Sequence, residues 1–480
     1  MTAVLGREEI PLSFVERVRP RARAIALAAG LALAPLGMTV TAASPAAAAG
    51  VQLVYGLGDN YYGQAGNRLA STSAGSPLPV TGLAQDVAQV AVGGYISVAL
   101  HTDGTVWTWG SNFAGALGDG SGVQKRTVPG RVPGLPRIVQ VAAGGAHVLA
   151  VGEDGSLWAW GANGSDQLGD GRDRSLEMSA ATPVRVLLSG VAKVAAGSIF
   201  SVAVRTNGEV WTWGSNDQGQ LGNQTSVAVS PTPVRALTPD GITEVAAGYA
   251  HALAMTGDGS VWAWGQNASG ELGIGTLVSR NAPVRVEGLF GVTRISAGME
   301  HSMAIGAGGV VWTWGENQNG QVGDGTVTDR LRPTGLPLGA PSTRIAAGNQ
   351  FDLAVLSDGT LWGWGSLPVT ESNRPPGRTP RQVAGASGVV QVVAAQFSVL
   401  LLMEARPVAV PNLQYLQDDA AGDSSAFQLD GVGLTLGTVS LTDVGCQFSG
   451  MIMGQDPAAG TVVPALTAVS VVLVDPNVCF

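Results

Sequence analysis

Residues 194–222 read VAAGSIFSVAVRTNGEVWTWGSNDQGQLG and contain the pattern that decides the fold. Small residues lead into an apolar segment, which is followed by an Asn207-Gly208 turn and the pair Trp211 and Trp213. Asn-Gly favours a tight hairpin in which both central residues have positive φ. Residues two apart on a strand face the same side, so both tryptophans are expected to pack against a neighbouring sheet. The stretch therefore predicts three consecutive antiparallel strands.

The same pattern recurs along the chain. All twelve tryptophans fall into six W-x-W-G motifs, whose final glycines are spaced 51, 53, 51, 50 and 50 residues apart. A seventh, degenerate copy is VYGLG at 54–58, with Tyr55 and Leu57 in the places of tryptophan. Seven short units that cannot bury their faces alone predict a seven-bladed β-propeller. The tryptophans predicted to be structural are Trp107, Trp109, Trp158, Trp160, Trp211, Trp213, Trp262, Trp264, Trp312, Trp314, Trp362 and Trp364.

The two ends of the repeat region carry complementary halves of one unit. The chain enters with a W-x-W half and leaves with the small-residue half, Val392-Val393-Ala394-Ala395. We therefore expect residues 51–58 to pair with the sheet formed by 389–403, so that the N- and C-terminal strands share the closing blade. Such closure removes sheet edges that would otherwise promote aggregation.

Composition agrees with an all-β protein and narrows the function. Charged residues make up 13% of the 480 residues, and there are 69 glycines, as short strands and tight turns require. The net charge of −9 argues against a nucleic-acid surface, which needs a basic footprint.

The first 49 residues predict export. Arg17, Arg19, Arg21 and Arg23 precede an apolar run at 24–40, and a row of alanines ends at Ala49. This is typical of a secretory signal peptide (1–49), since the run is short of the ~20 residues that a membrane anchor needs. After cleavage no membrane span is expected. In an exported chain the isolated pair Cys446 and Cys479 predicts a disulfide bond.

The string V-A-A-G-x-x-H…D-G-x-V-W-x-W-G-x-N-x-x-G-Q-L-G resembles the regulator-of-chromosome-condensation repeat, over residues 51 to about 405. The resemblance implies a seven-bladed propeller at 50–405. Family members act as a nucleotide-exchange factor for a small nuclear GTPase, as light-signalling receptors and as secreted β-lactamase inhibitors, so it does not decide the function. The seventh unit departs from the pattern, because Trp364-Gly365 is followed by Ser366-Leu367-Pro368 with no G-Q-L-G.

The remaining segment, 406–480, resembles a PASTA domain, a small α+β module of bacterial wall-synthesis enzymes and receptor kinases. The resemblance rests on VPNL at 410–413 and QDPAAGTV at 455–462. It implies contact with peptidoglycan fragments, as in some family members, or a role only as a spacer, as in others. This copy lacks the usual glycine after the Val-Pro segment, where Tyr415 follows Gln414, and it carries the cysteine pair.

Internal comparison of the units argues against a catalytic or metal site. His147, His251 and His301 occupy a position that holds Ile96, Phe200, Phe351 and Ser398 in the other units, as expected of packing residues. His101 precedes a hairpin turn and is expected to be exposed. Two thiols cannot complete a zinc site, and no calcium loop, nucleophile elbow or phosphate loop is present in the sequence. We therefore predict no enzyme activity, catalytic residue, metal or cofactor.

The loops after each G-Q-L-G hold most of the non-repeating polar residues, and binding residues concentrate on loops of rigid scaffolds. The candidate binding residues there are Lys125, Arg126, Arg172, Arg174, Arg280, Arg330, Arg332, Arg374 and Arg378. The alternative is that these cations only solvate long loops.

The sequence thus predicts a secreted or cell-wall-associated monomer of a Gram-positive type of bacterium. Its expected role is non-enzymatic binding or scaffolding, with an unidentified extracellular protein or peptidoglycan as partner. The alternatives are a secreted enzyme inhibitor, for instance of β-lactamases, and a guanine-nucleotide exchange factor, which the signal peptide places in the wrong compartment.

Overall fold

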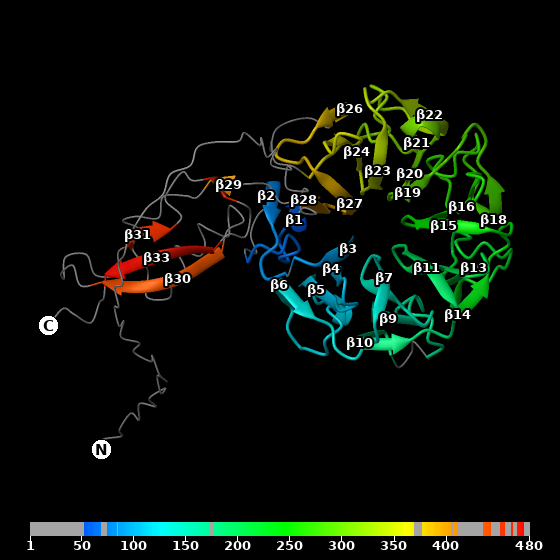
Figure 1. The fold of residues 1–480 in the computed structure, drawn as a ribbon. Coiled ribbons are helices and arrows are strands. Elements are labelled where there is room, and N and C mark those ends of the chain that lie inside the picture. Colours follow the sequence, from blue (N-terminus) through cyan, green and yellow to red (C-terminus); the bar gives the residue numbers. More distant parts are fainter. Residues whose placement is uncertain are drawn as a thin grey trace, which may run out of the picture. The chain divides into compact units, whose positions relative to one another are not determined.

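The computed structural model describes residues 52–68, 74–83, 85–172, 177–368 and 377–404, together with five short strands between 408 and 474. Residues 52–404 form seven four-stranded antiparallel sheets around a central axis (Figure 1). The all-β, seven-bladed propeller is therefore confirmed. The predicted signal peptide at 1–49 lies outside the described residues.

Six blades use four consecutive strands each, ordered from the axis outward. Blade I contains β3 (Val87–Val92), β4 (Ile96–His101), β5 (Val106–Ser111) and β6 (Lys125–Arg131). Blade II contains β7 (Ile138–Ala143), β8 (His147–Gly152), β9 (Leu157–Ala162) and β10 (Ser179–Arg185). Blade III contains β11 (Val191–Ala196), β12 (Phe200–Arg205), β13 (Val210–Ser215) and β14 (Val229–Arg235).

Blade IV contains β15 (Ile242–Ala247), β16 (His251–Thr256), β17 (Val261–Gly265) and β18 (Arg280–Arg285). Blade V contains β19 (Arg294–Ala297), β20 (His301–Ile305), β21 (Val311–Gly315) and β22 (Arg330–Leu336). Blade VI contains β23 (Ser342–Ala347), β24 (Phe351–Leu356), β25 (Leu361–Gly365) and β26 (Gly377–Gln382). Two short 3-10 turns interrupt the connections, η1 (Phe113–Gly115) and η2 (Ala307–Gly309).

Blade VII is built from both ends of the repeat region, in the order β27 (Val389–Ala395), β28 (Ser398–Glu404), β1 (Gln52–Gly58) and β2 (Ala74–Pro79). Strand β1 pairs with β28 along its whole length, from Gln52 opposite Glu404 to Gly58 opposite Ser398. In Figure 1 the blue and brown strands meet in this sheet. The predicted shared closing blade is confirmed.

The hairpins between the second and third strands differ from the expected geometry. In blade III, Gly208 N donates to Arg205 O (2.9 Å) and Arg205 N donates to Glu209 O (2.9 Å). Blade V has positive φ at both Gly308 (70°) and Gly309 (78°), as predicted, but in blade III only Gly208 has positive φ (82°), so the prediction is wrong there. The loop is a three-residue turn with a glycine bulge. Asn207 is favoured there because its side chain accepts a bond from Glu209 N (3.1 Å).

The two tryptophans of each motif have different environments. The second one is fully buried between blades in Trp109, Trp160, Trp213, Trp264, Trp314 and Trp364, whereas its partner two residues earlier is only partly buried. Trp213 Nε1 donates to Gln167 O (2.8 Å) in the loop of blade II. A Cβ at Gly169 of that loop would lie 2.6 Å from the Trp213 ring, and Gly169 has φ of 67°. G-Q-L-G and the second tryptophan are therefore complementary surfaces of adjacent blades.

The two departures from the repeat meet at the closing blade. Blade VI lacks G-Q-L-G, and the residue facing it from blade VII is Leu57, where the other blades carry the buried tryptophan. Leu57 is buried in one cluster with Phe351, and Leu367 packs against the same cluster. The smaller side chain thus matches the irregular connection that it packs on.

Glutamines on the innermost strands join three pairs of blades. Gln391 Nε2 donates to Val90 O (3.2 Å), and Gln391 Oε1 accepts from Val90 N (3.2 Å), which joins blade VII to blade I. Gln89 bonds Val141 of blade II in the same two-sided way, and Gln140 bonds Val194 of blade III. The ring is therefore closed by polar bonds as well as by apolar packing.

The tail contains a three-stranded sheet of order β30 (Thr435–Thr442), β33 (Ala468–Val474) and β31 (Ile452–Asp456), in which β30 and β33 are parallel. Strand β29 (Val408–Ala409) pairs with β32 (Val462–Val463). The helix expected of an α+β module, and Cys446 and Cys479, lie outside the described residues, so the module and the disulfide stay predictions.

Candidate functional site: the mouth of the central channel

The up-and-down order of the strands gives the propeller two different faces. The turns between first and second strands and the loops between third and fourth strands share one face, which we call the upper face. Ser111 N, at the end of β5, donates to Tyr95 O (2.9 Å) in the β3–β4 turn and joins these two kinds of segment. The hairpins and the connections between blades lie on the opposite, lower face.

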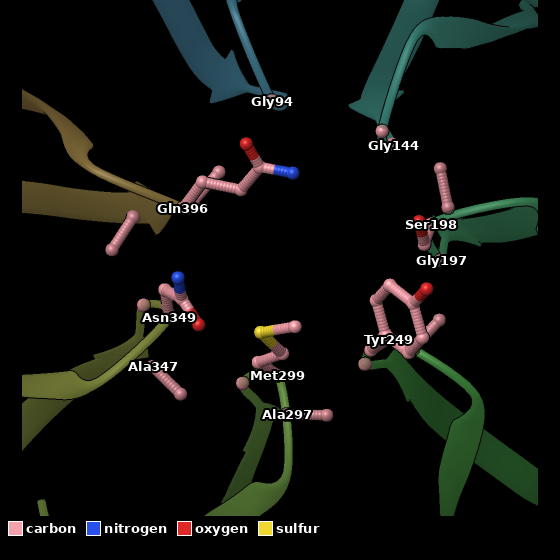
Figure 2. A pocket seen from close by; sticks show the side chains of 18 of the residues that line it. Gly94, Gly144, Gly197, Ser198, Tyr249, Ala297, Met299, Ala347, Asn349 and Gln396 are labelled. Atoms are coloured by element: carbon pink, nitrogen blue, oxygen red, sulfur yellow. The ribbon is translucent and has the colours of Figure 1, made fainter. Parts of the chain in front are cut away.

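A cavity of about 160 Å³ opens at the axis on the upper face. Each of the seven first turns contributes one residue to its ring, from Gly94, Gly145, Ser198, Tyr249, Met299, Asn349 and Gln396. Figure 2 labels all of these except Gly145 around the opening. Below them the wall is alanine and glycine, as expected for a crowded axis. A Cβ at Gly144 would lie 2.2 Å from Gly197 O, so only glycine allows the strands to approach this closely. We call the cavity and these seven residues the cup.

Exposed apolar side chains surround the cup. Tyr95, Ile199, Tyr249 and Phe397 keep 38%, 36%, 43% and 44% of their surface accessible. Tyr95 continues outward into an aromatic group, since its ring lies 5.1 Å from Tyr62, which lies 4.9 Å from Tyr61. Apolar surface gathered around a cavity is typical of an interaction site, and tyrosine is a frequent anchor in such sites.

The chemistry of the cup favours binding. Its side chains offer a phenol, a hydroxyl and two amides, which donate and accept hydrogen bonds, and a thioether, which is a weak acceptor. In the part of the chain that the structure describes, no three His, Cys, Asp or Glu side chains lie close enough together to hold a metal ion. A search of the same residues for a helix long and apolar enough to cross a membrane also found none.

The three equivalent histidines are buried at the start of the second strands, where they bond the next blade. Nε2 of His147 lies 2.9 Å from Ser201 Oγ, and Nε2 of His251 lies 3.0 Å from Ser302 Oγ. Burial lowers the pKa of His147 to about 4 and that of His251 to about 3, so both rings are neutral at neutral pH. Their position between blades agrees with the packing role that was predicted.

His301 differs because it faces a carboxylate. Its Nε2 lies 2.8 Å from Asp352 Oδ1, and both side chains are fully buried. Burial alone would lower the pKa of His301, but the charge of Asp352 outweighs it and raises that pKa. In this blade the His301–Asp352 pair takes the place of the His–Ser bonds that His147 and His251 form.

The prediction for His101 is wrong. The side chain is 5% exposed, and its Nδ1 lies 2.7 Å from Asp86 Oδ1. The ring also packs 5.6 Å from Trp107, which draws it away from solvent. The position of His101 before a hairpin turn gave no indication of its contact with Asp86.

The predicted basic loop residues are spread over the outer strands. Lys125 is exposed and donates to Tyr61 O (3.2 Å). Arg126 pairs with Asp119, Arg172 with Asp170 (3.1 Å) and Arg330 with Asp324 (2.6 Å). These three cations therefore stabilise their own loops.

The remaining candidates on described residues are at the start of β18, in β22 and in β26, namely Arg280, Arg332 and Arg378. Arg174 and Arg374 lie outside the described residues. A binding role for the basic set stays a prediction. The cup was not predicted from the sequence, although the residue after each V-A-A-G varies between blades while the small residues before it change little.

One position of the G-Q-L-G loops carries an unsatisfied carboxylate. In Gln220 and Gln321 the side-chain oxygen accepts a hydrogen bond from a backbone N–H, and the side-chain nitrogen donates one to another side chain. Glu271 replaces this glutamine in blade IV. Its Oε2 accepts from Ser269 N (2.8 Å), while its buried Oε1 has no partner.

Burial and the nearby charge of Glu300 raise the pKa of Glu271. Ionisation therefore costs the folded state more than the unfolded chain, and stability falls as the pH rises from the unfolded-state pKa through the folded-state pKa.

We expect Glu271→Gln to stabilise the protein by about 1–2 kcal/mol at pH 7.5 and by less at pH 4. Thermal melts at both pH values measure this. Gln220→Glu is the matched control and should show the opposite change; equal melting of Glu271→Gln and parent at pH 7.5 would contradict the assignment.

Comparison with known protein families decides the identity of the fold. The RCC1-like domain model matches residues 53–400, which is most of the chain. The chain belongs to the RCC1-like domain family. The upper face of this RCC1-like propeller is therefore the surface to compare among relatives.

Two plant relatives and one solved structure illustrate the similarity. RCC1 domain-containing protein RUG3, mitochondrial, of Arabidopsis thaliana is 36% identical over 208 residues, 42% of this chain and 46% of the relative. Ultraviolet-B receptor UVR8 of the same plant is 34% identical over 242 residues, 48% and 53% of the two chains. The RCC1-like propeller thus matches about half the length of each. The solved structure is that of Prp20p of Saccharomyces cerevisiae, which was reported with its binding to Gsp1p and histones. The two structures have a TM-score of 0.65 at 22% identity, and the match covers 74% of this chain and 92% of Prp20p. At this identity the similarity shows the fold alone.

Proposed function

We propose that this RCC1-like propeller is an exported, non-enzymatic binding or scaffolding protein of a bacterial cell envelope that holds a protein partner on its upper face. The observation that carries the proposal is the cup, a cavity ringed by one variable residue from every blade and by exposed Tyr95, Tyr249 and Phe397. A signal-type leader supports export. That a similar propeller is described as binding Gsp1p and histones supports a protein partner.

The proposal predicts that binding depends on the upper face. Tyr249→Ser with Met299→Ser removes apolar surface at the cup, and we expect a partner captured from envelope extract to be lost at least tenfold, because anchors in central pockets dominate interface energy. Phe290→Ser is the matched control, since Phe290 is 74% exposed on the lower face. Quantitative mass spectrometry of the captured proteins measures both. Equal recovery by the upper-face variant and the parent would refute the proposal.

For the tail we propose contact with the cell wall, supported by its resemblance to PASTA modules. Cosedimentation with purified peptidoglycan compares the full chain with a chain ending at Ala405. Equal recovery of the two would remove the wall contact from the proposal.

A secreted enzyme inhibitor is the second candidate, favoured by the same exposed apolar ring, because inhibitors bind enzymes through such surfaces. Titration against a class A β-lactamase separates the two, and absence of inhibition at micromolar concentration would count against it.

A further inference from the structure

Acidic side chains stand beside the cup on blade V. Glu300 directly follows Met299 of the ring, and Glu316 N donates to Glu300 O (2.9 Å). Glu300 accepts from Ser269 Oγ (2.9 Å), and Glu316 accepts from Gln321 Nε2 (2.9 Å). Both side chains are half-buried and open to solvent. We call Glu300 and Glu316 the acidic corner.

Among the residues that the structure describes, no lysine or arginine balances the acidic corner. Within the described ranges, no Lys or Arg forms an ion pair with Glu300 or Glu316, and the nearby Arg330 is occupied by Asp324. Burial raises the pKa of Glu316, and the charge of Glu300 raises it further, while the charge of His301 partly offsets this. His301 lies behind them but already bonds Asp352. A partner that brings a positive charge would relieve the repulsion between the two carboxylates.

The aromatic group on the other side of the cup already holds one of the chain's own cations. Lys125 Nζ lies 5.4 Å from the centre of the Tyr61 ring, the geometry of a cation–π contact. The border of the cup that favours an added positive charge is therefore the acidic corner, in a protein of net charge −9.

The size of the cup limits what enters it. A volume of about 160 Å³ corresponds to roughly five water molecules, and it is well below the ~300 Å³ or more of a typical cofactor pocket. Its wall is alanine and glycine, and its opening carries Tyr249 and Met299. One apolar side chain fits this space, whereas a whole cofactor does not.

We infer that the cup binds a protein segment in which an apolar side chain enters the cavity while an adjacent lysine or arginine meets Glu300 and Glu316. This inference rests on the proposed function and specifies the chemistry of the partner. It also agrees with the asymmetry of the ring, in which Gly94 lies on one side and the larger Tyr249 and Met299 lie on the other and would form the contact (Figure 2).

Synthetic nine-residue peptides test the inference on the full-length protein. Each peptide carries Leu, Met or Trp at its centre and Lys or Arg one to four positions away in a Gly-Ser background; matched series carry Gln or Glu in place of the cation. We expect fluorescence anisotropy to detect binding of the basic series, weakened by added salt, and not of the acidic series. A chitin tetramer serves as the probe for a glycan ligand.

Substitution of the acidic corner gives the decisive comparison. Glu300→Gln with Glu316→Gln should weaken the basic peptides about tenfold and leave melting unchanged or raised. Glu153→Gln with Glu287→Gln, on the lower face, is the matched control and should leave affinity unchanged. The inference is overturned if no basic peptide binds, if the acidic series binds equally, if only the chitin tetramer binds, or if the double variant binds as the parent does. The proposed function is judged separately by the loss of captured partner in the Tyr249→Ser, Met299→Ser variant.

Discussion

A chain that begins at residue 59 in place of residue 50 should aggregate or be digested rapidly by protease. It lacks β1, which lies between β28 and β2 and pairs with β28 over seven residues. Strand β28 is apolar and buried from Val399 to Met403, so its uncovered edge would pair with other chains. The truncated chain also lacks Val54 and Leu57, whose buried side chains each contribute about 1.5–3 kcal/mol to the stability of the core.

Size-exclusion chromatography and limited proteolysis measure the effect. The control is a chain that ends at Ala405, which loses the tail but keeps all seven blades and should stay soluble and resistant. A truncated N-terminus that remains monomeric and melts with the parent would mean that the ring does not depend on the shared blade.

Trp213→Ala should destabilise the protein by about 3–5 kcal/mol, through the cavity left between blades II and III. Trp213 is fully buried, and its loss also removes one of the two donors to Gln167 O, the other being Ser201 Oγ (2.8 Å). Trp211→Ala is the matched control, because this side chain is only partly buried on the same strand, and it should cost clearly less. Since each blade supports its neighbours, the loss should loosen the whole ring.

Urea unfolding followed by fluorescence gives both free energies. Trp213→Phe separates packing from the hydrogen bond, since it keeps most of the ring but not the indole N–H. Equal destabilisation by Trp211→Ala and Trp213→Ala would show that the two positions are not distinguished by burial between blades.

Local patterns predicted the blades well because each blade is made of contacts near in sequence. The W-x-W pairs, the Asn-Gly and Asp-Gly turns and the small-residue strands lie within one unit of about fifty residues, and their order is visible without any long-range contact. Ring closure was also predictable, because the two ends carry complementary halves of a unit.

Contacts between units were harder to predict. The different burial of Trp211 and Trp213 depends on where the loop of the preceding blade lies, and the burial of His101 depends on Asp86. The pairing of Arg126 and Arg330 with Asp119 and Asp324 changed the interpretation of the basic loops, since an ion pair depends on distances that composition does not contain.

By itself the sequence determined the fold class, the number of blades and the way the ring closes, because a repeated local pattern with a regular period admits few other architectures. Only the tertiary structure decided which face carries a candidate site. The seven residues of the cup are about fifty positions apart in the chain, and they become neighbours because rotation of the blades about one axis brings equivalent turns together. Charge balance was decided in the same way, since among the described residues no Lys or Arg pairs with Glu300 or Glu316, while Arg126, Arg172 and Arg330 of the loops are paired.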